Sequence, residues 1–209
     1  KFYVVKWAVG GTSIAPDYNA SKGRFWSAAP EWLAQAKPTS DGGNSLLLSF
    51  IQEIDMCIDK TLSRLKDGYQ IDAFLWHQGE SDYAKSKDYY RNLKTMVAYV
   101  RMHLTEKTGK DYSRLPFIFG TVARSNKYFS REVENAMKQL AAEDPNMHLI
   151  DMSGAELLDD RLHFTAHSAE YLGQQVYKQL EQIIKGVTVR TDELKGKRLG
   201  IIGDSYVKN

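Results

Sequence analysis

Short apolar runs alternate with amphipathic segments along the whole chain. The apolar runs end in glycine, proline or polar turns, which predicts buried strands at 2–9, 71–76, 116–122, 147–151 and 198–202. Between these runs, apolar residues recur every three or four positions, which predicts helices at 44–65, 88–103, 131–142 and 165–185. Strands that alternate with helices are typical of a parallel sheet covered by helices, so the sequence predicts an α/β fold.

The strand predicted at 71–76 ends abruptly in a polar turn, His77-Gln78-Gly79-Glu80-Ser81-Asp82. In an open α/β sheet, ligands bind beyond the carboxyl ends of the strands. A side-chain amide, a flexible glycine and a carboxylate therefore stand next to one another where chemistry is expected. An ordinary strand-to-helix turn would have a similar composition, so this turn alone does not decide between the two interpretations.

Two further polar turns could complete a site for acyl transfer. Such a site needs a nucleophile, a base, a carboxylate that orients the base, and donors for the oxyanion. The backbone amides of Gly11 and Thr12, together with Gln78, are candidate donors at strand ends. The candidate base is His163, and Asp160 lies three residues before it, so that one short loop could aim both side chains at one point.

Other assignments remain open at this point. Glu80 could orient the histidine instead of Asp160, or bind a substrate hydroxyl. Ser13 and Ser81 are alternative nucleophiles, although neither lies in a Gly-x-Ser-x-Gly turn. A metal site is a third interpretation, in which His163 and His167, four residues apart, share a helix face near Asp159 or Asp160, or His77 pairs with Glu80.

An irregular segment at 16–43 is rich in aromatic residues. A loop of this length in a compact domain is usually functional or disordered. Its density of Tyr, Phe and Trp favours an ordered loop that lines or covers something. We therefore expect the part from Tyr18 to Trp32 to hold a sugar ring, although packing onto the domain would explain the same residues.

Composition limits the classes of function. The 209 residues are 43% hydrophobic and 26% charged, which is typical of a globular domain with a substantial core. A net charge of +2 gives no reason to expect a nucleic acid or a membrane surface as partner. Cys57 is the single cysteine, so no internal disulfide is possible, and we expect it to pack in the core.

These motifs together resemble a known family. The block Trp76-His77-Gln78-Gly79-Glu80-Ser81-Asp82 is similar to the W-x-Q-G-E-x-D block of the sialate O-acetylesterase and acetylxylan esterase group, which belongs to the SGNH (GDSL-like) hydrolases. Gly10-Gly11-Thr12-Ser13-Ile14 is similar to the G-G-T-S-I segment of that group, and Asp160-Arg161-Leu162-His163-Phe164 to its D-x-x-H-F block. The resemblance covers residues 1–185 and implies a flavodoxin-like, three-layer α/β/α fold with a central parallel sheet.

The resemblance also assigns roles to residues. It implies that His163 is the catalytic base, that Asp160 or Glu80 is the triad acid, and that Gly11, Thr12, Gln78 and Gly79 contact the oxyanion or the substrate. The nucleophilic serine of the family lies in a G-Q-S-N block on the first strand, and no such block precedes Gly10 here. Gly203-Asp204-Ser205 resembles the G-D-S block of the wider superfamily instead.

Two domain arrangements follow from this departure. In both, residues 1–186 form an SGNH-like domain without the usual N-terminal nucleophile strand. Residues 187–209 then contribute a linker and a strand. This strand either completes the same sheet, which would make Ser205 the nucleophile, or begins a further SGNH domain of a longer tandem protein.

The implied activity is a serine esterase that removes O-acetyl groups from carbohydrate through an acyl-enzyme, with no cofactor and no metal. The alternative is a non-catalytic carbohydrate-binding remnant that lacks its nucleophile. The expected partner is an acetylated sugar or glycan, with neither nucleic acid nor membrane, and the resemblance suggests a periplasmic or extracellular location.

Overall fold

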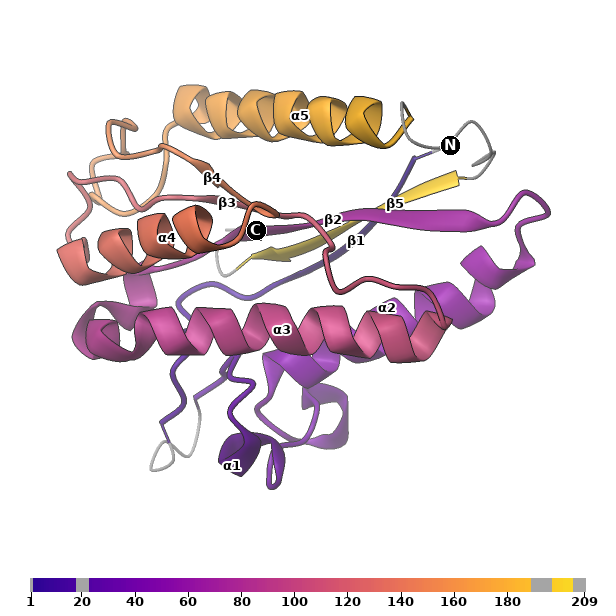
Figure 1. The fold of residues 1–209 in the computed structure, drawn as a ribbon. Coiled ribbons are helices and arrows are strands. Elements are labelled where there is room, and N and C mark those ends of the chain that lie inside the picture. Colours follow the sequence, from indigo (N-terminus) through magenta and orange to yellow (C-terminus); the bar gives the residue numbers. More distant parts are fainter. Residues whose placement is uncertain (1, 18–22, 189–196, 205–209) are drawn as a thin grey trace.

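A computed structural model describes residues 2–17, 23–188 and 197–204. At its centre lies a five-stranded sheet in the order β1-β5-β2-β3-β4, in which every pair of neighbours is parallel (Figure 1). The strands are β1 (Phe2–Ala8), β2 (Tyr69–His77), β3 (Phe117–Gly120), β4 (Met147–Ile150) and β5 (Lys197–Asp204). The predicted α/β class with a central parallel sheet is therefore confirmed.

The last strand in the sequence lies inside the sheet. β5 pairs with the whole length of β1, from Phe2 opposite Arg198 to Ala8 opposite Asp204. On its other side β5 pairs with β2, where Asp204 is opposite His77. The carboxyl ends of β1, β5 and β2 therefore lie level with one another at one edge of the sheet.

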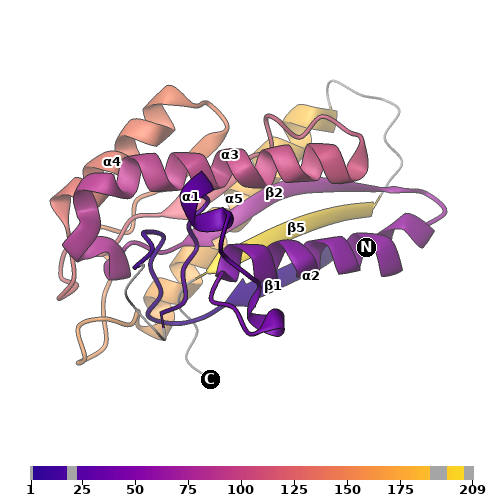
Figure 2. The ribbon, with the colours of Figure 1, turned by 90° about the horizontal axis from the view of Figure 1, so that it is seen from below.

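Helices cover both faces of this sheet and produce a three-layer α/β/α architecture (Figure 2). The longer helices are α2 (Leu46–Lys60), α3 (Tyr89–Thr108), α4 (Arg131–Glu143) and α5 (Ala166–Thr188). Residues of α2, α3 and α4 share one apolar cluster with β2 and β3. Leu180 of α5 packs in a second cluster with Ala73, Ile118 and Ile150, so α5 covers the opposite face.

The helices begin and end at residues whose chemistry sets the boundary. The Ser45 hydroxyl accepts from the Leu48 backbone N–H at 3.1 Å and caps α2, and Ser130 caps α4 in the same way. Helix α3 continues to Thr108, five residues beyond the predicted end, until Gly109 adopts a left-handed φ of 69°. Helix α2 ends at Lys60 rather than residue 65, and the 3-10 turn η2 (Leu62–Arg64) follows.

The irregular segment after β1 contains two short helical turns, α1 (Pro30–Leu33) and η1 (Thr39–Asp41). Its aromatic side chains Phe25, Trp26 and Trp32 are buried, and Trp26 packs edge-on against Phe50 and Trp76. The expectation that these three rings hold a sugar was wrong, because apolar rings gain more by joining the core than by facing water. Tyr18 lies outside the described residues.

Candidate active site

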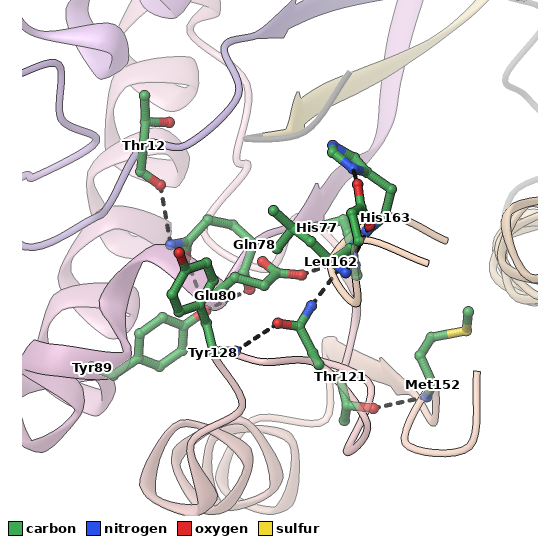
Figure 3. A network of polar contacts seen from close by, with 12 residues as sticks. Thr12, His77, Gln78, Glu80, Tyr89, Thr121, Tyr128, Met152, Leu162 and His163 are labelled. Carbon is green, nitrogen blue, oxygen red and sulfur yellow. Dashed lines mark hydrogen bonds and ion pairs between the residues drawn. The ribbon is translucent and has the colours of Figure 1, made fainter. Parts of the chain in front are cut away.

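Three loops meet where β1, β2 and β5 end. Gly10 to Ala15 follow β1, and Gln78 to Asp82 follow β2 and open the 3-10 segment η3 (Glu80–Asp88). The loop that carries His163 joins β4 to α5. Figure 3 shows Thr12, Gln78, Glu80 and His163 gathered in this region. The structure thus brings the three predicted motifs to one edge of the sheet.

His163 and Asp160 form a hydrogen-bonded pair. His163 Nδ1 contacts Asp160 Oδ2, and the same carboxylate accepts from the backbone N–H groups of Leu162 at 2.9 Å and His163 at 3.0 Å. The hydrogen bond from the His163 ring, with help from these backbone groups, lowers the pKa of Asp160 below its usual value. Asp160 is therefore a carboxylate at neutral pH and can stabilise a positive charge on the imidazole.

The backbone around this pair is bent and held in place. Arg161 adopts φ 54°, a left-handed conformation that is uncommon for a residue with a side chain. This turn lets the Arg161 N–H donate to the Leu158 carbonyl at 2.8 Å and the Leu158 N–H donate to the His163 carbonyl at 2.8 Å. The loop after β3 adds two bonds, from the Lys127 N–H to the Arg161 carbonyl at 3.0 Å and from Asn126 Nδ2 to the Leu162 carbonyl at 3.2 Å. Strain of this kind is typical of functional sites.

Glu80 lies beside a different histidine. Its carboxylate is buried, and Oε1 is 3.8 Å from His77 Nε2. The His77 ring in turn lies 5.0 Å from the ring of Phe164, the residue after His163. Of the two acids that compete for the base, Asp160 is therefore the one in contact with the His163 ring, while Glu80 contacts His77.

Gln78 and Asp82 fix the turn that follows β1. Asp82 is fully buried and accepts from the Ile14 N–H at 2.8 Å, the Ala15 N–H at 3.0 Å and Gln78 Nε2 at 2.5 Å. Gln78 Nε2 also donates to the Thr12 carbonyl at 3.3 Å. Both protons of this buried amide thus have acceptors within the protein, an arrangement that favours a positioning role over direct donation to a ligand.

Tyr89 completes this network from α3. Its hydroxyl donates to the Gln78 backbone carbonyl at 3.0 Å and contacts Gln78 Oε1 at 3.3 Å (Figure 3). Burial raises the pKa of Tyr89 well above its usual value, so this hydroxyl keeps its proton and remains a donor. The orientation of Gln78 is therefore fixed from three sides.

The glycines of the motifs differ in their surroundings. Gly11 adopts φ 72°, which favours glycine, and a Cβ there would meet nothing within 4 Å. A Cβ on Gly79 would lie 2.7 Å from Val122 Cγ2 and 3.1 Å from Met137 Cε. Gly79 is therefore required by packing between β2 and the layer that contains α4.

The candidate serines have unequal positions. Ser13 is almost fully buried, and its hydroxyl donates to the Ala15 carbonyl at 2.8 Å, within its own turn. Ser81 is partly buried in η3. Ser205 lies outside the described residues and directly follows Asp204, the last residue of β5, in the sequence.

Within residues 2–17, 23–188 and 197–204, no three His, Cys, Asp or Glu side chains are grouped in a way that could hold a metal ion. Across the same part of the chain, none of the helices combines the length and the hydrophobicity that a bilayer span requires.

Several residues of the site could not be assigned a role from sequence. Asp82 belongs to the quoted motif, but its contacts to Ile14 and Ala15 span 68 and 67 positions of the chain. Asn126 and Tyr89 lie outside all three motifs. The sequence placed Asp82 in a motif and Tyr89 on the apolar face of a predicted helix, without assigning either a partner. Asn126 lies in a polar stretch, and such residues are common on surfaces.

These features place the chain among the SGNH-type hydrolases, the class that its motifs predicted. Residues 2–182 match the model of a family described as carbohydrate esterase, sialic acid-specific acetylesterase. The chain therefore belongs to this carbohydrate esterase family, and membership supports a general esterase role.

A plant protein is similar over part of the chain. A probable carbohydrate esterase of Arabidopsis thaliana is 29% identical over 119 residues, which are 56% of this chain and 42% of the relative. The X-ray structure of that Arabidopsis protein superimposes with a TM-score of 0.52 and 26% identity, covering 66% of this chain and 52% of the other. The chain thus spans about half of the relative or less.

Proposed function

We propose that the protein is a serine esterase that removes O-acetyl groups from carbohydrate through an acyl-enzyme. The observation that carries this proposal is the contact between the His163 ring and the ionised Asp160 at the carboxyl edge of the sheet. Membership of a carbohydrate esterase family supports the class of substrate. No cofactor enters the proposed reaction.

His163 acts as base and then as acid. With Nδ1 held by Asp160, Nε2 accepts the proton of the nucleophilic hydroxyl as its oxygen attacks the acetyl carbon. The imidazolium then returns this proton to the sugar oxygen, which leaves as a free hydroxyl. Water attacks the acetyl-enzyme with the same base and releases acetate, so the enzyme is regenerated.

Ser205 supplies the nucleophile in this proposal. Asp204 pairs with Ala8 on one side and with His77 on the other, and Ser205 is next in sequence. Support comes from the register, because β5 ends level with the strands that lead into the Gly11 and Gln78 turns. Ser13 is the weaker candidate, since its hydroxyl is buried and bonded within its own turn.

Backbone N–H groups stabilise the oxyanion. Gly11 and Thr12 lie in the turn that Asp82 and Gln78 hold in place, which supports preorganised donors at this position. Gly79 belongs to the neighbouring turn, where it is buried and packed against Val122. In this proposal Gln78 holds Thr12 in place and does not donate to the oxyanion, because its amide N–H groups already have two acceptors.

The test is hydrolysis of 4-nitrophenyl acetate by the 209-residue chain and by its Ser205→Ala, Ser13→Ala and His163→Ala variants. We expect activity in the wild type and in Ser13→Ala, and its loss in the other two. Activity retained in Ser205→Ala would move the nucleophile to Ser13 or Ser81. A wild type that neither hydrolyses the ester nor reacts with a fluorophosphonate would favour the non-catalytic, carbohydrate-binding alternative.

A further inference from the structure

Two tyrosines form an exposed stacked pair at the edge of the sheet that holds the site. Tyr83 in η3 and Tyr128 in the loop after β3 have ring centroids 4.9 Å apart and planes inclined by 29°. They are 48% and 36% exposed, although large aromatic side chains usually gain by burial. In such a stack the two rings cover each other's inner faces, so the pair offers the outer face of a ring together with two hydroxyls.

The pair is joined to the proposed catalytic loop by hydrogen bonds. The Tyr128 N–H donates to Asn126 Oδ1 at 2.8 Å, and Asn126 Nδ2 donates to the carbonyl of Leu162, the residue before His163 (Figure 3). Asn126 is almost fully buried, so this link is shielded from water. On the other side, Tyr83 lies one turn beyond Glu80 in η3. The pair is therefore held at a fixed place next to the site.

The chemistry of the pair suits a sugar ring. A pyranose presents apolar C–H groups on its faces and hydroxyls around its rim. The tyrosine rings can pack against such a face, and their hydroxyls can donate to or accept from the rim. Lys127 Nζ lies over the Tyr128 ring, 5.4 Å from its centroid, and Tyr83 is stacked on the same ring, so the outer face of the more exposed Tyr83 is the one that a sugar would contact. By contrast, the rings of Phe25, Trp26 and Trp32 are buried and cannot serve in this way.

We infer that Tyr83 and Tyr128 form an accessory subsite that binds a further sugar ring of the glycan whose acetyl group is removed at His163. This inference rests on the proposed function and extends it, because it makes an oligosaccharide a better substrate than a single acetylated sugar. Binding energy from the distant ring is used to position the reacting ester.

The experiment compares a small acetyl ester with two acetylated oligosaccharides. For the wild type and Tyr83→Ala, kcat/KM is measured with 4-nitrophenyl acetate and with partially acetylated xylotetraose and cellotetraose. We expect the ratio of oligosaccharide to small ester to fall roughly 2- to 10-fold in Tyr83→Ala, the size of one lost aromatic contact. Tyr83→Trp, which keeps a stacking ring, should restore the ratio. The matched control is Tyr177→Ala on α5, where the tyrosine is 67% exposed and should not affect the ratio.

Binding without turnover separates the subsite from the esterase. Saturation-transfer NMR with unacetylated xylotetraose and cellotetraose should show contact in the wild type and a weaker signal in Tyr83→Ala. An unchanged ratio, or no binding of either tetrasaccharide to the wild type, would overturn the subsite. Binding that depends on Tyr83 in a chain with no esterase activity would leave the subsite standing and refute the proposed function.

Discussion

Replacing Asp82 with asparagine tests whether the turn after β1 is held by a buried carboxylate. Three donors converge on the two oxygens of Asp82, from Ile14, Ala15 and Gln78. An asparagine keeps one acceptor oxygen and turns an N–H₂ group toward the remaining donors. At least one buried N–H then loses its acceptor.

The magnitude follows from that count. A buried donor left without a partner costs about 1–3 kcal/mol, and bonds to a charged acceptor lie at the upper end. Asparagine recovers part of this free energy, because it removes a buried charge. Burial raises the pKa of Asp82 by more than the Ala15 and Ile14 N–H groups lower it, so the charge is costly where it lies. We expect the free energy of unfolding to fall by about 2–4 kcal/mol. With a urea slope of about 2 kcal/mol/M, the midpoint falls by about 1–2 M.

Urea unfolding followed by tryptophan fluorescence measures this change. Trp26 is a suitable reporter, since its indole N–H donates to Thr12 Oγ1 at 3.1 Å in the same turn. Asp88→Asn is the control, because Asp88 is exposed and pairs only at the surface with Arg91, so its loss should cost less than about 1 kcal/mol. A loss below about 0.5 kcal/mol in Asp82→Asn would refute the reasoning.

The pH dependence gives a second check on Asp82. The pKa of Asp82 is raised in the folded state, so the folded protein binds this proton more tightly than the unfolded chain does. The contribution of Asp82 to wild-type stability therefore rises as pH falls toward the ordinary pKa of 3.8. Asparagine lacks this response. The difference in unfolding free energy between wild type and Asp82→Asn should therefore be larger at pH 4 than at pH 8.

Further predictions concern catalysis, acid stability and packing. His163→Ala should lower kcat for an acetyl ester at least about 10³-fold, and Asp160→Asn about 10²- to 10⁴-fold, while circular dichroism stays unchanged; residual activity near wild type in both would contradict the pair as base and orienting acid. The pKa of Glu143 is lowered to about 2 by bonds from Tyr90 and others, so its contribution to stability is present above 4.5 and is lost as pH falls toward about 2. In Glu143→Gln the urea midpoint should therefore fall less between pH 6 and pH 3 than in the wild type, and an equal fall would contradict this origin. Gly79→Ala should lower the melting temperature, at a cost of about 1–3 kcal/mol from the clash with Val122, whereas Gly154→Ala, in open space, should not.

Features encoded by neighbouring residues could be predicted from the sequence. Leu47, Phe50, Ile54 and Ile58 recur along one helix face, and all four are buried in α2. His163 and Asp160 lie three residues apart, and a short loop does bring them into contact. Local spacing is enough in both cases, because the chain geometry over a few residues limits where the side chains can lie.

Features that depend on distant pairing could not be predicted. The sequence left Asp160 and Glu80 in competition for His163. Only the packing of β2 beside the His163 loop shows that Asp160 contacts His163 and that Glu80 contacts His77. It also gave no indication whether an aromatic ring faces the core or the solvent. Trp26 became a core residue and Tyr83 stayed exposed, although both lie in polar, irregular stretches.

The position of β5 has a consequence for how the protein folds. β1 is an edge strand attached to the sheet only through β5, so strands from the opposite ends of the described sequence must meet before β1 has a neighbour. Closing so long a loop costs conformational entropy before any hydrogen bond is gained, and such a high contact order slows folding. During synthesis, β2, β3 and β4 can associate as soon as they emerge. The proposed catalytic edge, in contrast, is assembled last, so a ribosome-bound chain that has not yet released residues 197–204 would hold most of its core but no complete site.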